Sequence, residues 1–154
     1  MKQQTIKQSV SINGTGLHTG QKGTFTFNPA PEHHGIKFRR VDIEGQPIVE
    51  ARVENAVDTS RGTTIAQNGV RVYTVEHILA SVRGAGIDNI LIDINCEEPP
   101  IQDGSAKNVI ETLKYAGIVE QNAEREYLRI NKEVKYINEK IGAEITIVPA
   151  NDFR

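Results

Sequence analysis

The stretch "RVYTVEHILASVRGAG" (residues 71–86) decides the fold, because a strand runs directly into a helix within it. Apolar residues recur in it with the i, i+3, i+4, i+7 spacing of one helix face. They are Val75, Ile78, Leu79 and Val82. This spacing predicts an amphipathic helix from about Thr74 to Arg83, which ends near Gly84 or Gly86 and packs its apolar face on a sheet.

Short segments with alternating apolar residues lie on both sides of this helix, and this alternation is typical of half-buried strands. The clearest segments are "GTFTFNP" (23–29), "GIKFRRV" (35–41), "IVEARV" (48–53) and "NILIDIN" (89–95). The dipeptide Asn68-Gly69 indicates a tight hairpin between two further strands. A second amphipathic helix is predicted over residues 106–116, ended by Gly117. Two helices among many short strands predict an α+β fold.

The composition excludes several classes of protein. The chain has 154 residues, 38% of them hydrophobic and 25% charged, which fits a globular protein with a core. Its net charge of −2 argues against a nucleic-acid partner. The single cysteine, Cys96, excludes a disulfide framework, so we expect a reducing, cytoplasmic compartment. The first ten residues lack the apolar core of a signal peptide, and no apolar run approaches the ~18 residues of a membrane span, so no stable membrane insertion is expected.

The chain is predicted to hold one domain and the beginning of another. The polar stretch "EQNAERE" (120–126) is a plausible boundary, and two or three more strands are predicted beyond it. About thirty residues are too few to form a core of their own. We therefore expect residues 1–123 to form a first α+β domain, and residues 124–154 to be the incomplete start of a second.

The adjacent residues Glu76 and His77 lie off the apolar stripe of the first helix. The small residues Ala80, Ser81 and Gly84 share their side of the helix. Two interpretations are open: a solvated surface pair, or a site that a ligand or another layer of protein approaches closely. Zinc motifs on one helix need a second histidine, and the position four residues before His77 is Tyr73. If His77 binds a metal, further protein ligands must come from elsewhere.

The loop "NGTGLHTG" (13–20) joins two predicted strands and contains His18. It matches neither the dinucleotide fingerprint nor a phosphate-binding P-loop. It is either a glycine-rich hairpin loop or a place where backbone and imidazole approach a ligand closely. Asp103 has two interpretations as well, since it either caps the second helix or orients a metal-bound histidine from the second coordination shell.

Five segments occur together in a specific order and spacing. They are "GTGLHTG" (14–20), "DTSRGTT" (58–64), "TVEHILAS" (74–81), "GIDNILIDIN" (86–95) and "EPPIQDGSA" (98–106). Their ordered combination resembles the zinc-dependent UDP-3-O-acyl-N-acetylglucosamine deacetylases of lipid A biosynthesis, over essentially the whole chain. Some members of that family are fused to a 3-hydroxyacyl-[acyl-carrier-protein] dehydratase.

The resemblance implies a fold of two similar α+β domains. Each is a two-layer sandwich, with a mostly antiparallel sheet and two helices on one face, and the helices of both domains pack around the active site. It implies that His77 is a Zn²⁺ ligand and Glu76 the general base. The other two zinc ligands and a further histidine would belong to the second domain. His18 would support the site, and Thr59, Ser60 and Arg61 would contact the substrate. The segment that corresponds to Ser60, Arg61 and Gly62 is more apolar in many members.

The implied reaction is hydrolysis of the N-acetyl group of UDP-3-O-acyl-N-acetylglucosamine, which releases acetate in an early committed step of lipid A biosynthesis. Glu76 would take the proton of a water molecule that the metal activates. Because His77 is one ligand of three, residues 1–154 alone are expected to be inactive. The alternative is a non-enzymatic nucleotide-binding or structural α+β module, for which no metal dependence is expected.

Overall fold

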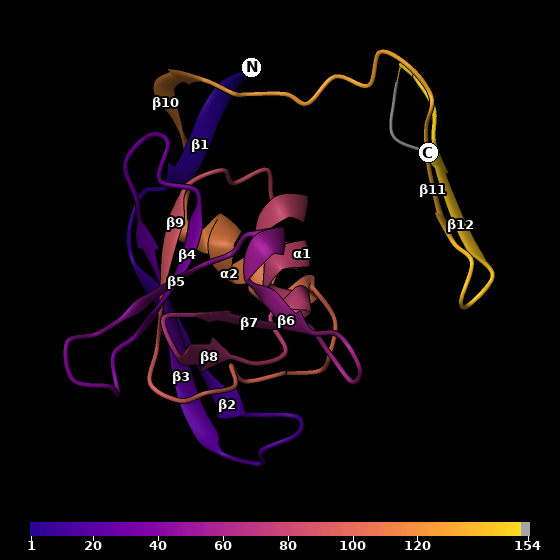
Figure 1. Cartoon of the computed structure of the whole chain (residues 1–154). Coiled ribbons are helices and arrows are strands. Elements are labelled where there is room, and N and C mark those ends of the chain that lie inside the picture. Colours follow the sequence, from indigo (N-terminus) through magenta and orange to yellow (C-terminus); the bar gives the residue numbers. More distant parts are fainter. Residues whose placement is uncertain (152–154) are drawn as a thin grey trace.

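A five-stranded sheet forms the centre of the computed structural model, which describes residues 1–151. Its order is β2 (Val10–Thr15), β3 (Lys22–Pro29), β9 (Ile90–Ile94), β4 (Ile36–Arg40) and β5 (Ile48–Glu50). All neighbouring strands are antiparallel except β4 and β9. The helices α1 (Glu76–Gly84) and α2 (Lys107–Ala116) lie on the same side of this sheet (Figure 1). The predicted α+β sandwich is therefore confirmed.

A smaller three-stranded sheet carries the chain from β5 to α1. It follows a short 3-10 helix, η1 (Val53–Asn55), and contains β6 (Ala56–Asp58), β7 (Thr64–Gln67) and β8 (Val70–Val72). Asn68 and Gly69 join β7 to β8 with φ angles of +52° and +81°. Positive φ at both central residues is what a type I′ hairpin turn requires, so the predicted hairpin is confirmed.

The core lies between the central sheet and the two helices. Phe25, Phe27 and Phe38 are fully buried on the sheet, and the rings of Phe25 and Phe27 meet edge to face with centroids 5.2 Å apart. Helix α1 buries Ile78 and Val82, as its apolar spacing predicts. It begins two residues later than predicted because Thr74 has a φ angle of +52°, which is outside the helical region. No helix among residues 1–151 has the length and apolar character needed to cross a bilayer.

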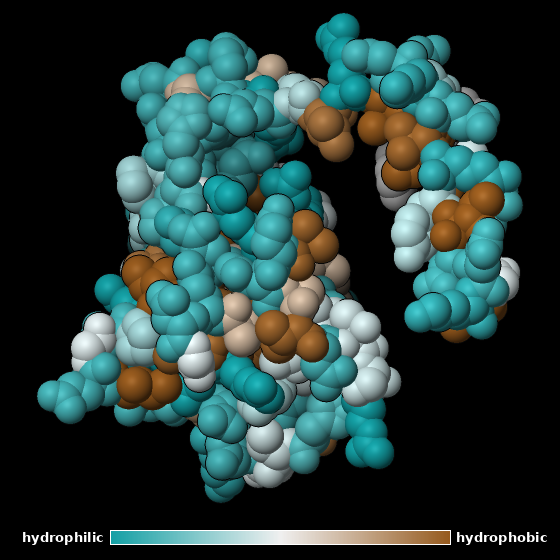
Figure 2. All heavy atoms as spheres, in the orientation of Figure 1, coloured by the Kyte–Doolittle hydropathy of each residue, from teal (hydrophilic) through white to brown (hydrophobic). Residues whose placement is uncertain are grey.

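The first strand, β1 (Lys2–Ile6), pairs antiparallel with β10 (Ile118–Glu124). Much of the polar stretch 120–126 therefore belongs to a strand, and it is polar because one of its faces is exposed. The hairpin of β11 (Val134–Asn138) and β12 (Ala143–Ile147) stands apart, joined to β10 by an extended segment (Figure 1). Figure 2 shows apolar residues gathered on this hairpin. Its exposed apolar residues are Val134, Tyr136, Ile137, Ile141, Ile145 and Ile147.

Candidate active site

A tight turn at Thr74 directs the chain from β8 into α1. Thr74 is 5% exposed and has a φ angle of +52°, which is rare for a β-branched residue. The neighbouring peptides hold the turn: Tyr73 N–H donates to the Glu97 carbonyl at 2.9 Å, and Val75 N–H donates to the Thr63 carbonyl at 3.1 Å. This turn places Glu76 and His77 in the first turn of the helix, beside the loop that precedes β7.

One of the two carboxylate oxygens of Glu76 accepts a hydrogen bond. Thr63 N–H donates to Glu76 Oε2 at 2.8 Å. The loop approaches closely here, because a Cβ atom on Gly62 would lie 3.1 Å from Glu76 Oε1. No residue within 1–151 donates a hydrogen bond to Oε1. Glu76 therefore has a fixed position and one oxygen free to accept a proton.

The imidazole of His77 is oriented by a backbone carbonyl. Its Nδ1 atom lies 2.9 Å from the Gly104 carbonyl oxygen, so Nδ1 carries the proton and donates it. Nε2 then presents a lone pair, which is the usual arrangement of a histidine that binds a metal. The ring thus fits one zinc ligand. No three His, Cys, Asp or Glu side chains within residues 1–151 form a metal-binding group.

Asp103 directly precedes Gly104, the residue whose carbonyl contacts this imidazole. Its Oδ1 accepts hydrogen bonds from Ser105 N–H at 3.0 Å and from the Ser105 hydroxyl at 2.8 Å. These bonds hold the pKa of the Asp103 carboxyl below its ordinary value. The Ser105 hydroxyl in turn accepts from Lys107 N–H at 3.2 Å, at the start of α2. The group on the ring is thus the Gly104 carbonyl, and not the Asp103 side chain as one of the two interpretations had it. Asp103 does not cap α2 either, and instead shapes the turn that presents this carbonyl.

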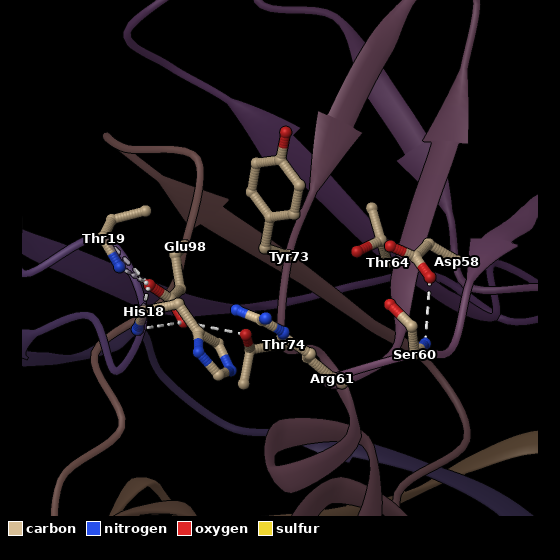
Figure 3. A pocket seen from close by; sticks show the side chains of 10 residues that line it. His18, Thr19, Asp58, Ser60, Arg61, Thr64, Tyr73, Thr74 and Glu98 are labelled. Carbon is tan, nitrogen blue, oxygen red and sulfur yellow. Dashed lines mark hydrogen bonds between the residues drawn. The ribbon is translucent and has the colours of Figure 1, made fainter.

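A pocket of about 230 Å³ lies beside the start of α1. Its lining includes His18, Ser60 and Arg61, three of the residues predicted to support the site or contact substrate. The fourth, Thr59, is exposed and lies outside the lining. Figure 3 shows the Arg61 side chain extending across the pocket towards His18 and Thr74. Arg61 has no ion-pair partner within the described chain, so a cationic group faces this space.

Glu98 lies at the edge of the same pocket and is fully buried. Its carboxylate accepts from His18 N–H, Thr19 N–H, the Thr19 hydroxyl and the Thr74 hydroxyl, at 2.8 to 3.1 Å (Figure 3). Burial raises the pKa of Glu98, but these hydrogen bonds outweigh it and bring the pKa below its ordinary value of 4.5. Glu98 is therefore ionised at neutral pH.

Comparison with known proteins decides the family. Residues 3–154 match the sequence model of the UDP-3-O-acyl N-acetylglycosamine deacetylase family. The chain belongs to this family.

Two relatives illustrate how much of such a protein the chain represents. It is 44% identical over 153 residues to a bifunctional enzyme LpxC/FabZ of Bacteroides thetaiotaomicron, and this covers 99% of the chain and 33% of the relative. It is 48% identical over 136 residues to a UDP-3-O-acyl-N-acetylglucosamine deacetylase of Saccharophagus degradans, which covers 87% of the chain and 44% of the relative. The chain thus spans a third to under a half of the length of these deacetylase-family proteins.

The family predicted from the five ordered segments is confirmed, whereas sequence reasoning missed Glu98. A glutamate before two prolines reads as a surface residue, since charged side chains are rarely fully buried. The sequence near Glu98 carries no signal of its burial; in the structure, a Cβ atom added at Gly16 would lie 2.6 Å from Glu98 Oε2. The glycine loop therefore follows a buried carboxylate closely.

Proposed function

We propose that this chain is the N-terminal part of a zinc-dependent hydrolase that removes the N-acetyl group of UDP-3-O-acyl-N-acetylglucosamine in lipid A biosynthesis. The observation that carries the proposal is the first turn of α1. There, His77 is held through Nδ1 by the Gly104 carbonyl with Nε2 free, next to a glutamate with one free carboxylate oxygen. Membership of the deacetylase family and the names of the relatives support the choice of substrate.

In this mechanism, bound zinc would polarise the acetyl carbonyl and lower the pKa of water. His77 supplies one ligand through Nε2. Glu76 Oε1 accepts the proton of the attacking water, while Thr63 N–H holds the other carboxylate oxygen still. The proton on Glu76 then passes to the sugar amine as acetate leaves. His18, Ser60 and Arg61, which line the pocket, contact the substrate, and the cationic Arg61 suits its anionic phosphates.

The missing ligands are proposed to come from a second domain. The β1–β10 pair closes the first unit at Glu124, which agrees with a first domain over residues 1–123. The β11–β12 hairpin exposes apolar residues. The remainder of a second domain, packed against the first, would cover them. The bifunctional names of several relatives support a fused dehydratase in the complete protein.

The experiment uses the complete protein with Glu76→Gln and His77→Ala, assayed for acetate release and for bound zinc. Glu76→Gln is expected to keep its zinc and to lose about 10²–10⁴ in kcat, which is the usual contribution of a general base. His77→Ala is expected to lose zinc as well, because one ligand is gone. Glu54→Gln, at an exposed glutamate of η1, is the control and should behave as wild type.

Two results would contradict the proposal. If wild-type protein loaded with zinc releases no acetate from this substrate, the function is wrong, and a non-enzymatic nucleotide-binding or structural module becomes the better description. If Glu76→Gln retains full activity, the base is another residue.

Residues 1–154 alone provide a separate prediction. With one histidine ligand in place, this chain should bind zinc weakly and show no turnover. Zinc titration and an acetate assay check this, and stoichiometric tight zinc together with turnover would contradict the one-ligand assignment.

A further inference from the structure

We infer that Glu98 is a positioning residue that joins the glycine loop (residues 14–20) to the start of α1, and thereby sets the positions of His18, Glu76 and His77. Its effect on turnover rests on the proposed function, whereas its effect on the local structure does not. The argument starts from the hydrogen bonds of the carboxylate.

Both oxygens of Glu98 are used. Oε2 accepts from Thr19 N–H at 2.8 Å, from the Thr19 hydroxyl at 2.9 Å and from His18 N–H at 3.0 Å. Oε1 accepts from the Thr74 hydroxyl at 2.8 Å, and His18 N–H also lies 3.1 Å from it. The donors thus come from the loop that carries His18 and from the turn that starts α1, two segments more than fifty residues apart in the sequence.

Because Glu98 is charged and buried, its carboxylate needs these hydrogen bonds. The side chain is fully buried, and none of the ion pairs found within residues 1–151 includes it. A buried carboxylate without a cation depends entirely on its N–H and O–H donors. If either segment moved away, the carboxylate would lose donors that water could not easily replace. The charge therefore holds both segments in one arrangement.

The glycine loop is shaped to this carboxylate. A Cβ atom on Gly16 would lie 2.6 Å from both Glu98 Oε2 and the Thr19 hydroxyl, so any side chain at this position would displace Glu98. The segment after Glu98 follows the same loop, because Ile101 N–H donates to the Thr15 carbonyl at 3.1 Å. It then reaches Gly104, whose carbonyl holds the His77 ring. One continuous segment, 98–104, thus contacts the loop of His18, the turn at Thr74 and the ring of His77.

The contact with Thr74 reaches the catalytic pair most directly. Thr74 has a positive φ angle and precedes Glu76 by two residues. Its hydroxyl donates to Glu98, and this bond favours a backbone conformation that threonine otherwise avoids. Without the carboxylate, we expect Thr74 to relax and the first turn of α1 to shift.

The test is Glu98→Gln in the complete zinc-loaded protein, with Asp88→Asn as the matched control. Asp88 is a carboxylate with a 12% exposed side chain, and it accepts from Gln4 N–H at 2.9 Å beyond the other end of α1. For Glu98→Gln, kcat/KM should fall roughly 100-fold, the scale of a small misplacement of catalytic groups. Bound zinc should stay near the wild-type level. Amide hydrogen exchange should accelerate in residues 16–19 and 74–79. Asp88→Asn should lower Tm and leave kcat/KM and exchange at 74–79 unchanged.

A rescue separates positioning from general stability. In the Glu98→Gln background, Thr74→Gly should restore part of kcat, since glycine adopts positive φ without help from a hydroxyl. Thr74→Val alone, which replaces the hydroxyl by a methyl group, should accelerate exchange at 74–79, and this variant is the test if Glu98→Gln does not fold. The inference is overturned if exchange at 74–79 stays at the wild-type rate in these variants, or if Asp88→Asn reduces kcat/KM as much as Glu98→Gln. If wild-type protein has no deacetylase activity, the proposed function fails, and the exchange measurements alone decide the inference.

Discussion

Replacing Thr74 tests whether strain or hydrogen bonding dominates at the start of α1. A β-branched residue at a φ angle of +52° costs about 1–2 kcal/mol relative to glycine. Against this, the bond from the Thr74 hydroxyl to the ionised Glu98 carboxylate, 2.8 Å long and buried, contributes about 1.5–3 kcal/mol. Glycine also costs about 0.5–1 kcal/mol through the entropy of the unfolded chain. The balance predicts that Thr74→Gly lowers the free energy of unfolding by about 1.5 kcal/mol, despite relieving the strain.

Two further variants at Thr74 allow the stabilities of three variants to be ranked. Thr74→Ser keeps the hydroxyl, so its stability should be close to wild type. Thr74→Val keeps the strained backbone and loses the bond, so it should be destabilised by about 2 kcal/mol or more and rank below Thr74→Gly. Urea unfolding of residues 1–154, followed by circular dichroism, measures all three. If Thr74→Gly is more stable than wild type, strain exceeds the bond. If Thr74→Val and Thr74→Ser have the same free energy of unfolding, the hydroxyl contributes nothing. Each of these two results would refute the reasoning.

Two other predictions concern stability. The pKa of Glu98 in the folded state lies below its ordinary value of 4.5. The ionised carboxylate therefore stabilises the fold above that pH, and this contribution is lost as the pH falls through the folded-state pKa. In urea titrations between about pH 6 and about pH 3, wild type should lose more stability than Glu98→Gln. Leu113→Ala, at a fully buried position of α2, should cost about 2–5 kcal/mol, whereas Tyr115→Ala, at a 79% exposed position of the same helix, should stay within about 0.5 kcal/mol. Equal Tm values for these two helix variants would contradict the assigned packing.

Features that depend on local chemistry could be predicted from the sequence. Asn68-Gly69 specified its turn because few residues accept two successive positive φ angles. The apolar spacing of α1 identified Ile78 and Val82 as buried, and the position of His77 off that stripe left it able to face a ligand.

Features that depend on distant partners could not be predicted. Nothing near Thr74 in the sequence indicates a positive φ angle, since the supporting carboxylate lies twenty-four residues away. The carbonyl of Gly104 is a backbone group, so no residue type reveals that it holds the His77 ring. The pairing of β10 with β1 could not be predicted from the polar stretch at 120–126 either, because the partner strand lies at the opposite end of the unit.

The pairing of β1 with β10 has a consequence for re-engineering the topology. Arg125 N–H donates to the Met1 carbonyl at 2.8 Å, so the two ends of the main body are neighbours. A short peptide bridge between these ends, with new termini opened at the exposed loop around Gly45, would give a circularly permuted body with every strand pair of the sheets intact. In such a molecule the extended segment and its hairpin would no longer follow β10, and they could be attached at one of the new termini. Glu76 and His77 would stay on an unbroken piece of chain.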